Sequence, residues 1–434
     1  MKKISVFLAL ITFSFFTCQA QIITTVIGDG IKGSNGNGGQ ATSAEIETPV
    51  RVIVDKAGNL YVSEPDYNVI RKVNKSGVIS LFKGGFNYPT DLAIDDSGCI
   101  YVLDAANYEV KKINKTGAVT IVAGNGNDAS IGDGGPATSA SIGCGGISVD
   151  NFGNIYIAQS SQNSIRKINV NGIISTVAGN GTAGFSGDGA LATSAELNAP
   201  VSITPDSKGN IYVADENNNR IRKIDKNGII TTIAGNGIGG YAGDGGLADS
   251  AELASPCNTT IGTDGNIYVA DLMNSCIRVI SSSTNIITTF AGNGIGGYAG
   301  DGGLADSAEL DQPTSVAIDS LGTIYISDYA NSVVRMVTRG VPTGTNNIFS
   351  TGIISVYPNP SNGIFKISNS YQLLAKSQIQ VYNIIGEKVY VQPLRQAQGD
   401  NTIDLINQPA GVYLYRITSE KGEYISSGKL VIEK

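Results

Sequence analysis

Apolar and polar residues alternate in short runs along most of the chain, and Gly, Asn and Asp separate the runs. Alternation with a period of two, bounded by turn-forming residues, predicts β-strands rather than helices. The clearest stretch is residues 209–237, which read GNIYVADENNNRIRKIDKNGIITTIAGNG. It predicts three successive strands joined by tight turns, and most of the chain before residue 339 is a variation on it.

The stretch occurs six times, and a tyrosine marks each copy: Tyr61, Tyr101, Tyr156, Tyr212, Tyr268 and Tyr325. A further strand precedes each tyrosine and is expected to begin near Pro49, Pro89, Cys144, Pro200, Pro256 and Pro313. Four-stranded units repeated around an axis are typical of a β-propeller, which leaves few sheet edges exposed. We therefore predict an all-β chain in which residues 21–338 form a six-bladed β-propeller.

The two ends of this region predict how the propeller closes. Residues 21–30 read QIITTVIGDG and match the fourth strand of the other copies, IITTIAGNG. The sixth copy ends near Thr338 without a fourth strand of its own. We expect the N-terminal strand to complete the last blade, because this replaces two unpaired edges with a hydrogen-bonded seam.

The GNIYVAD core, followed by N-x-R-I-R-K-I, resembles the NHL family of six-bladed propellers over residues 21–338. The second copy departs from the motif at Cys99, and the third carries Gln159 where the others carry an acid. The family includes RNA-binding proteins and a lyase with a His-ligated metal. A net charge of −7 argues against a nucleic-acid partner, and a chain without His excludes that lyase chemistry.

Five of the six seams between copies carry an insertion such as GNGIGGYAGDGGLADSAEL, and only the seam around residues 86–89 lacks it. The A-x-x-A-x-L spacing predicts one short amphipathic helical turn. We place the insertions on the face that carries the loops between second and third strands, a loop-rich face suited to binding. The central position of the GDG core is held by Asn37, Asp133, Asp188, Asp244 and Asp301.

Each insertion offers a single core carboxylate, whereas calcium takes six or more oxygen ligands. We therefore favour Asx-turn capping by these aspartates over a metal site. We predict no cofactor, with calcium as the alternative.

Charged residues recur at two equivalent positions of the copies. One position holds Arg71, Lys111, Arg166, Arg222, Arg278 and Arg335, and the other holds Glu64, Asp104, Asp215, Asp271 and Asp328. A residue that recurs in every blade is better suited to holding blades together than to acting once at a site. We favour a ring of structural ion pairs over a polar binding ring.

Positions that differ between blades are better candidates for function. Two residues after the start of each first strand come Arg51, Asp91, Gly146, Ser202, Asn258 and Ser315, so one mouth of a central channel is expected to present Arg51 beside Asp91. Three aromatic residues, Phe185, Tyr241 and Tyr298, precede GDG in successive seams. If exposed, they would stack on sugar rings or hold a partner; we favour packing within the seams.

Four cysteines follow the N-terminal segment, at Cys99, Cys144, Cys257 and Cys276, without metal-site spacing. Only Cys257 and Cys276 share a repeat. They fall on the first and third strands, which the second strand separates, and whether they form a disulfide stays open.

The composition changes to Gly, Pro, Thr, Asn and Ser over residues 339–352, which predicts a linker. Residues 353–434 predict a small antiparallel β-sandwich of short strands. This segment resembles the type A C-terminal sorting domain of the type IX secretion system in Gram-negative bacteria. The motif residues are Tyr357, Pro358, Asn359, Pro360, Gly386, Gly411, Tyr413 and Lys429. The resemblance implies the type IX machinery as a partner, and release or attachment at the cell surface.

Residues 1–20 combine Lys2 and Lys3, an apolar run and a small residue before the expected cut, which predicts a cleaved signal peptide. A lipoprotein with its lipid on Cys18 is the alternative. No other segment has the length of apolar residues that a transmembrane helix requires. We expect a protein that passes through the periplasm and is secreted or held at the outer cell surface.

These observations favour a non-enzymatic binding protein whose loop-rich face holds a surface protein or a glycan. No nucleophile with a neighbouring base is evident in the pattern. The enzymatic alternative is a calcium-dependent lactonase or hydrolase that uses channel residues such as Asp91 and Asn258. A passive component of the cell surface is the third hypothesis.

Overall fold

The computed structural model describes residues 21–339, 355–357, 361–368, 377–383, 387–394, 401–419 and 424–434. The chain divides into two compact units, Met1–Pro342 and Thr343–Lys434, and each is described by itself. Within the described ranges no helix is long and apolar enough to cross a membrane. The expected signal peptide lies outside the described residues, as does the expected linker apart from residue 339.

The first unit consists of six four-stranded antiparallel sheets, numbered here in chain order. Their first strands are β2 (Val52–Val54), β6 (Pro89–Ile94), β10 (Gly145–Val149), β14 (Pro200–Pro205), β18 (Pro256–Ile261) and β22 (Pro313–Ile318). Their second strands are β3 (Leu60–Glu64), β7 (Ile100–Asp104), β11 (Ile155–Gln159), β15 (Ile211–Asp215), β19 (Ile267–Asp271) and β23 (Ile324–Asp328). Their third strands are β4 (Val69–Val73), β8 (Glu109–Ile113), β12 (Ser164–Ile168), β16 (Arg220–Ile224), β20 (Cys276–Ile280) and β24 (Val333–Arg339).

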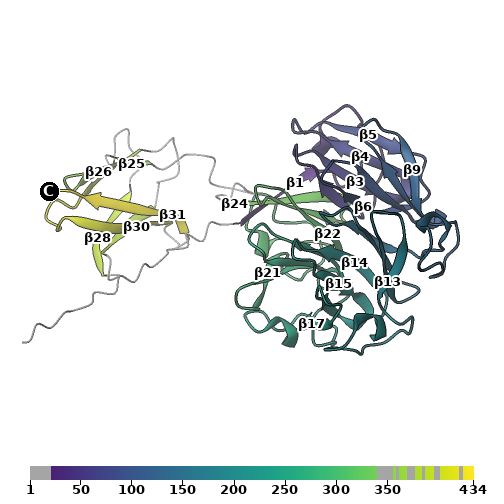
Figure 1. The fold of residues 1–434 in the computed structure, drawn as a ribbon. Coiled ribbons are helices and arrows are strands. Elements are labelled where there is room, and N and C mark those ends of the chain that lie inside the picture. The colour runs from purple at the N-terminus through teal and green to yellow at the C-terminus, as the bar shows by residue number, and fades with distance from the viewer. Residues whose placement is uncertain are drawn as a thin grey trace, which may run out of the picture. The chain divides into compact units, whose positions relative to one another are not determined.

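The fourth, outermost strands are β5 (Ile79–Gly84), β9 (Val119–Ala123), β13 (Ile174–Ala178), β17 (Ile230–Ala234), β21 (Ile287–Ala291) and, in sheet 6, β1 (Gln21–Ile27). Strand β1 pairs antiparallel with β24, from Gln21 opposite Arg339 to Ile27 opposite Val334. In Figure 1 the purple β1 lies beside the green β24. First strands contact first strands of neighbouring sheets, and β2 contacts both β6 and β22. The two ends of the repeat region therefore meet in one sheet.

The turn between first and second strands explains the recurrent D-x-x-G-N-x-Y pattern. In sheet 4, Oδ1 of Asp206 accepts hydrogen bonds from the backbone N–H groups of Lys208 and Asn210, both at 2.8 Å. The Tyr212 hydroxyl donates to the other carboxylate oxygen, and Lys223 lies over the tyrosine ring. Asp, Asn and Gly thus form the turn, while tyrosine ties it to the third strand. The repeated tyrosines belong to the scaffold.

The five insertions, residues 28–46, 124–142, 179–197, 235–253 and 292–310, fill the spaces between neighbouring sheets. Each ends in a single 3₁₀ turn followed by a buried Ala and a buried Leu or Ile, which agrees with the predicted helical turn. In the insertion of residues 235–253 these are Ala248, Ala251 and Leu253, all 0–1% exposed. The five turns are η1 (Ala41–Ser43), η4 (Ala137–Ser139), η5 (Ala192–Ser194), η7 (Ala248–Ser250) and η9 (Ala305–Ser307).

Four further 3₁₀ turns follow second strands: η2 (Pro65–Tyr67), η3 (Ala105–Asn107), η6 (Glu216–Asn218) and η8 (Leu272–Asn274). The insertions contact these loops, as predicted. For example, the Asn218 side chain donates a hydrogen bond to the Gly184 carbonyl at 2.7 Å. Both features therefore lie at the same, loop-rich end of the sheets. The opposite end, here called the short-turn face, carries the turns from first to second and from third to fourth strands.

Each insertion also runs along the outer edge of the following sheet. In sheet 4 the Ile230 N–H donates to the Ala190 carbonyl at 3.0 Å, and the Gly189 N–H donates to the Ile230 carbonyl at 2.8 Å. Equivalent pairs of hydrogen bonds cover β5, β13, β21 and β1. The insertions therefore satisfy backbone groups that an edge strand would leave open.

Sheet 2 is the exception, because the seam before it lacks an insertion. No described segment pairs with the outer edge of β9, where Val119 is 39% and Ile121 46% exposed. Phe82 and the buried Phe86 occupy the gap between sheets 1 and 2 instead, with Phe82 edge-on to Tyr61 at 4.8 Å between ring centroids. Large aromatic side chains thus fill the gap that the buried Ala and Leu residues of an insertion fill elsewhere. They leave the outer edge of β9 unpaired.

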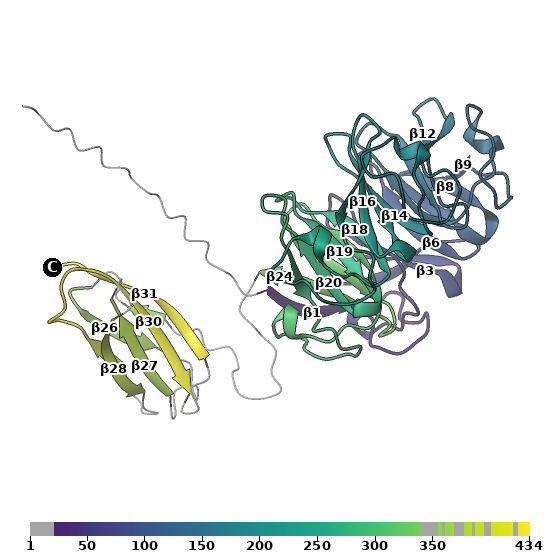
Figure 2. The same ribbon diagram turned by 90° about the horizontal axis from the view of Figure 1, so that it is seen from below.

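The second unit contains two antiparallel sheets with one shared core. One has the order β25 (Ser355–Tyr357), β26 (Ile364–Ser368), β29 (Asn401–Asp404). The other has the order β28 (Lys388–Leu394), β27 (Ser377–Tyr382), β30 (Gly411–Ser419), β31 (Tyr424–Ile432), seen side by side in Figure 2. Phe365 and Ile403 from the first sheet pack with Ile379 and Ile417 from the second. Two sheets packed face to face agree with the predicted sandwich.

Candidate functional site

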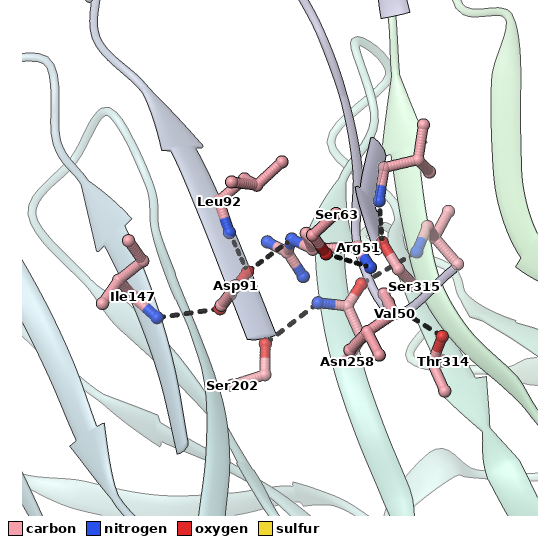
Figure 3. A network of polar contacts seen from close by, with 12 residues as sticks. Val50, Arg51, Ser63, Asp91, Leu92, Ile147, Ser202, Asn258, Thr314 and Ser315 are labelled. Carbon is pink, nitrogen blue, oxygen red and sulfur yellow. Dashed lines mark hydrogen bonds and ion pairs between the residues drawn. The ribbon is translucent and has the colours of Figure 1, made fainter. Parts of the chain in front are cut away.

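Asp91, Gly146, Ser202, Asn258 and Ser315 hold equivalent positions on the first strands of sheets 2 to 6, and Arg51 directly precedes β2. The five polar residues of this ring link neighbouring sheets (Figure 3). The Ser202 hydroxyl accepts the Thr259 N–H at 3.4 Å, and Oδ1 of Asn258 accepts the Val316 N–H at 3.0 Å. The Ser315 hydroxyl accepts the Val52 N–H at 3.3 Å. A side chain at this level therefore bonds the first strand of the next sheet.

Arg51 and Asp91 form the charged part of this ring, so the predicted juxtaposition is present. Nε of Arg51 lies 2.9 Å from Oδ1 of Asp91. The Asp91 carboxylate also accepts the N–H groups of Leu92 at 2.7 Å and Ile147 at 2.8 Å. Burial raises the pKa of Asp91, while Arg51 and the two backbone donors act in the opposite direction. The Asp91 carboxylate is buried and internally bonded, which differs from the expected exposed position at a channel mouth.

The lactonase hypothesis relied on the oxygens of Asp91 and Asn258. Both Asp91 oxygens have partners within the ring, and Oδ1 of Asn258 accepts a backbone hydrogen bond. The Asn258 amide donates to the Ser202 hydroxyl at 3.1 Å. These groups connect sheets and do not present a set of open oxygen ligands.

An open pocket of about 300 Å³ adjoins the ring, between the first strands of sheets 1 to 5. Arg51 and Ile147 line it at the level of the ring, and Ile94, Val149 and Ile261 line it where the strands end. The pocket therefore extends from Arg51 toward the short-turn face. The sequence pattern did not reveal it, because it depends on which side chains of five separated strands converge.

Phe185, Tyr241 and Tyr298 are neither fully exposed nor fully packed within the seams, the two alternatives considered from the sequence. Each is partly exposed, at 41%, 39% and 50%. One ring face lies on a guanidinium of the next sheet, with Arg220 3.6 Å from the centroid of Phe185 and Arg278 5.1 Å from that of Tyr241. The Tyr241 hydroxyl is 2.7 Å from the Thr289 hydroxyl. Packing orients these rings but leaves part of each surface available.

The GDG aspartates do not cap local Asx turns, and that prediction is wrong. Asp244 reaches across the seam, where Oδ1 lies 2.6 Å from Arg278 and Oδ2 accepts the Thr289 N–H at 3.0 Å. Asp133 and Asp301 make the same two contacts with their neighbouring sheets, and Asp188 pairs with Arg222 at 2.8 Å. Sequence spacing missed this role because the arginine is distant along the chain.

The recurrent charges form the predicted structural pairs. Arg278 lies 3.4 Å from Asp271, Arg335 lies 3.4 Å from Asp328, and these side chains are fully buried. Burial raises the pKa of Asp271 and of Asp328 to about 6. It raises the pKa of Glu64, whose partner Arg71 is 3.5 Å away, to about 7. Sheet 3 lacks the acid, and there Arg166 pairs with Asp133 alone.

The four cysteines in the described part of the first unit, Cys99, Cys144, Cys257 and Cys276, are free thiols, so Cys257 and Cys276 are not bridged. Cys276 is buried on β20, and the Cys257 thiol donates to the Thr314 carbonyl of sheet 6 at 3.5 Å.

The sorting motif is only partly covered by the structure. Tyr413 is buried in the core of the second unit, and its hydroxyl donates to the Pro409 carbonyl at 2.9 Å. Gly411 begins β30, the Lys429 backbone pairs with Leu414, and the Tyr357 backbone pairs with Lys366. Pro358, Asn359, Pro360 and Gly386 lie outside the described residues.

Comparison with known families tests both resemblances. Residues 355–433 match the model of the secretion system C-terminal sorting domain, and residues 181–239 match that of the teneurin NHL domain. The chain carries an NHL-repeat β-propeller and a type IX sorting domain. The sorting domain indicates that the protein is secreted or held at the outer cell surface, through the type IX system.

The NHL region is similar to teneurin-3 of Mus musculus, at 31% identity over 76% of this chain but only 14% of the relative. A structure of unknown function from Bacteroides thetaiotaomicron aligns with a TM-score of 0.59 at 19% identity, covering 74% of this chain and 76% of the other. An auxiliary nutrient binding protein from the same organism gives 0.57 at 16% identity with the same coverage. At these identities the likeness shows the propeller fold.

Proposed function

We propose that this NHL protein is a binding protein displayed or released at the cell surface, which holds a surface protein or a glycan through its insertions. Its residues 21–338 are proposed to form a six-bladed propeller in which each sheet is a blade and β1 closes the ring. Residues 1–20 would serve as signal peptide, 339–352 as linker and 353–434 as sorting domain.

One observation carries the proposal: residues 234–253 and 291–310 have identical sequences and occupy equivalent places before sheets 5 and 6. Each presents the same exposed apolar set, Ile238, Tyr241 and Leu247 in one and Ile295, Tyr298 and Leu304 in the other. Tyr241 and Leu247 both flank β21, at Thr289 and Ile286. Two identical exposed surfaces on adjacent blades suit a ligand that offers repeated contacts.

The composition of this surface favours a protein over a glycan. Exposed Ile and Leu beside Tyr give an apolar surface, and aromatic anchors with apolar neighbours dominate protein interfaces. The Asp244 carboxylate is engaged, since it binds Arg278 and Thr289. It is therefore not free to bind sugar hydroxyls.

The test is a capture screen with the mature chain against cell-surface proteins and a glycan array, each run with and without calcium. We expect a protein ligand that the double variant Tyr241→Ala, Tyr298→Ala no longer retains. The matched control is Phe152→Ala, which removes an exposed aromatic from the short-turn face. Retention unchanged in the double variant would place binding elsewhere, and self-association without any ligand would favour a passive surface component.

A further inference from the structure

The aromatic residue of the insertion before sheet 4 is stacked by an arginine of the chain itself. The guanidinium carbon of Arg220 lies 3.6 Å from the centroid of the Phe185 ring, and that of the buried Arg222 lies 4.8 Å away. Arg220 also donates hydrogen bonds to the Asn218 carbonyl at 3.0 Å and to the Asn236 carbonyl at 2.7 Å. One aromatic ring and two backbone carbonyls thus bind a single guanidinium group.

The two identical insertions present the same kind of ring without this arginine. Arg220 is the first residue of the third strand in sheet 4, whereas the third strands of sheets 5 and 6 begin with Cys276 and Val333. Both of these side chains are buried, and neither is basic. Tyr241 and Tyr298 therefore have only the buried arginine of the next sheet near them, at 5.1 Å from each ring centroid.

The space that Arg220 occupies is not filled by another group in sheets 5 and 6. In sheet 4 the guanidinium lies so close over Gly237 that a methyl group on this glycine would overlap it. At the equivalent Gly30, beside sheet 6, no described atom lies within 4 Å of the same point. At Gly294, beside sheet 5, the nearest described atoms are those of the Tyr241 ring, 3.7 Å away.

The hydrogen-bond acceptors of the Arg220 site are also present in these two sheets. The carbonyls equivalent to those of Asn218 and Asn236 belong to Asn274 and Asn293 in sheet 5, and to Asn331 and Asp29 in sheet 6. Within the described ranges none of these four carbonyls accepts a hydrogen bond. Each ring therefore lies beside two acceptors that a guanidinium from another molecule could use.

The charge of the two insertions favours a basic partner. Residues 235–253 and 292–310 contain no Lys or Arg. Asp249 and Glu252 in the first, and Asp306 and Glu309 in the second, form no ion pair with any described residue. Complementary charge steers association and disfavours wrong partners, so these carboxylates select for a positively charged segment.

We propose that the protein partner of the insertions presents arginine side chains, which stack on Tyr241 and Tyr298 in the place that Arg220 takes on Phe185. This inference rests on the proposed function and names the chemistry by which the partner is recognised. Lysine would supply the charge, but it has neither the flat group that stacks on a ring nor the paired donors that reach two carbonyls.

The experiment uses a labelled peptide of four Arg-Gly-Gly repeats as the probe. Its two matches carry lysine, which keeps the charge, or citrulline, which keeps the flat shape without the charge. Fluorescence anisotropy with the mature full chain measures the three affinities. We expect the arginine peptide to bind at least about tenfold tighter than either match, because only a guanidinium combines charge, stacking and paired donors.

Four variants locate the site. The double variant Tyr241→Ala, Tyr298→Ala should weaken binding of the arginine peptide about tenfold, and Tyr241→Phe, Tyr298→Phe should restore most of it. Phe152→Ala, on the short-turn face, is the control and should bind as the unmodified chain does. Arg220→Val removes the internal guanidinium from Phe185, so it should tighten binding about twofold or more by opening a third ring.

Equal affinity for the arginine and lysine peptides, or unchanged binding in the double alanine variant, would overturn the inference. If the alanine variant fails to fold, Arg220→Val decides, and no gain in affinity would count against it. A captured surface protein that requires Tyr241 and Tyr298, with no preference for the arginine peptide, would uphold the proposed function and refute the arginine chemistry. Preference for the arginine peptide without any captured protein would do the reverse.

Discussion

Sheets 2 and 4 are built from copies of the same sequence repeat, yet their outer strands lie in different surroundings. In sheet 4, β17 has an insertion along its free edge, and Ile230 is fully buried. In sheet 2, β9 has no described partner on that edge, and the equivalent Val119 is 39% exposed. Residues of similar hydrophobicity at the same repeat position are therefore core in one sheet and surface in the other. The insertion, not the strand sequence, decides which.

The comparison shows that an insertion has two separate structural roles. It fills the gap that widens between diverging sheets, and it bonds the open edge of the next sheet. Before sheet 2, Phe82 of β5 and Phe86 of the seam fill the gap, but no described segment bonds the outer edge of β9. An uncovered edge is a site where another strand can add, so β9 is the natural place for unwanted association.

The largest effect is expected from deleting residues 22–27. This removes β1, exposes the edge of β24 and takes away the strand that joins sheet 6 to the start of the repeats. We expect loss of cooperative thermal unfolding and a larger hydrodynamic radius. Circular dichroism and gel filtration measure both. A deletion variant that melts as the full chain does would contradict a role for β1 in closing the ring.

The second prediction compares matched truncations on the covered and bare strands. Ile230→Ala should lower the free energy of unfolding by about 2–4 kcal/mol, because it opens a hole under the insertion. Val119→Ala should change it by less than about 0.5 kcal/mol, because the side chain already meets solvent. Urea unfolding of both variants is the measurement. Equal losses would show that β9 is covered in solution.

The third prediction concerns the aspartate that ties an insertion to the next sheet. Asp244→Ala leaves the buried Arg278 with Asp271 alone and frees the Thr289 N–H. We expect a loss of about 2 kcal/mol, the usual worth of hydrogen bonds to a charged group. Added calcium should not alter the melting temperature of either protein. A calcium-dependent shift that Asp244→Ala abolishes would restore the metal hypothesis.

Sheet 1 offers a pH test, because its insertion has Asn37 in place of the aspartate. Arg71 there pairs with Glu64, whose pKa burial raises from 4.5 to about 7. Between these values the folded state holds a proton that the unfolded chain has lost, so stability should fall as pH rises from 5 to 7. Glu64→Gln should reduce this fall. Identical slopes of melting temperature against pH would contradict the raised pKa.

The smallest effect should appear in hydrogen exchange. In the covered sheets the Ile230 and Ile287 N–H groups donate to the insertion. The equivalent Val119 N–H of β9 has no described segment to receive it. We expect it to exchange faster than the other two, measured by mass spectrometry or NMR. Equal protection would indicate that something covers β9 in solution.

Much of the architecture could be predicted from the sequence, for local reasons. The turn residues Asp206, Asn210 and Gly209 sit within a few positions of one another, so their spacing alone indicates a turn. The match between residues 21–30 and the other fourth strands indicated the pairing of β1 with β24. The sorting domain was also predictable from the sequence, because the order of its motif residues along the chain is sufficient to identify it.

The candidate site was predicted less well. Arg51 and Asp91 were placed together from repeat register, but their burial was not foreseen. The aspartates of the insertions were assigned to local turns, because Arg278 lies a whole strand pair away from Asp244 in sequence. The identical sequences of residues 234–253 and 291–310 are visible in the chain itself. Counting repeats did not identify them as a candidate binding surface, because it does not show which of their side chains are exposed.

Strand periodicity, turn chemistry and repeat number are properties of neighbouring residues, and for these the amino-acid order was enough. Contacts between sheets depend on side chains that meet only after the repeats are arranged. Burial of Asp91, the pairing of Asp244 with Arg278 and the bare edge of β9 are all of this second kind. They arise where separate strands converge, and no local pattern in the chain encodes the distance between them.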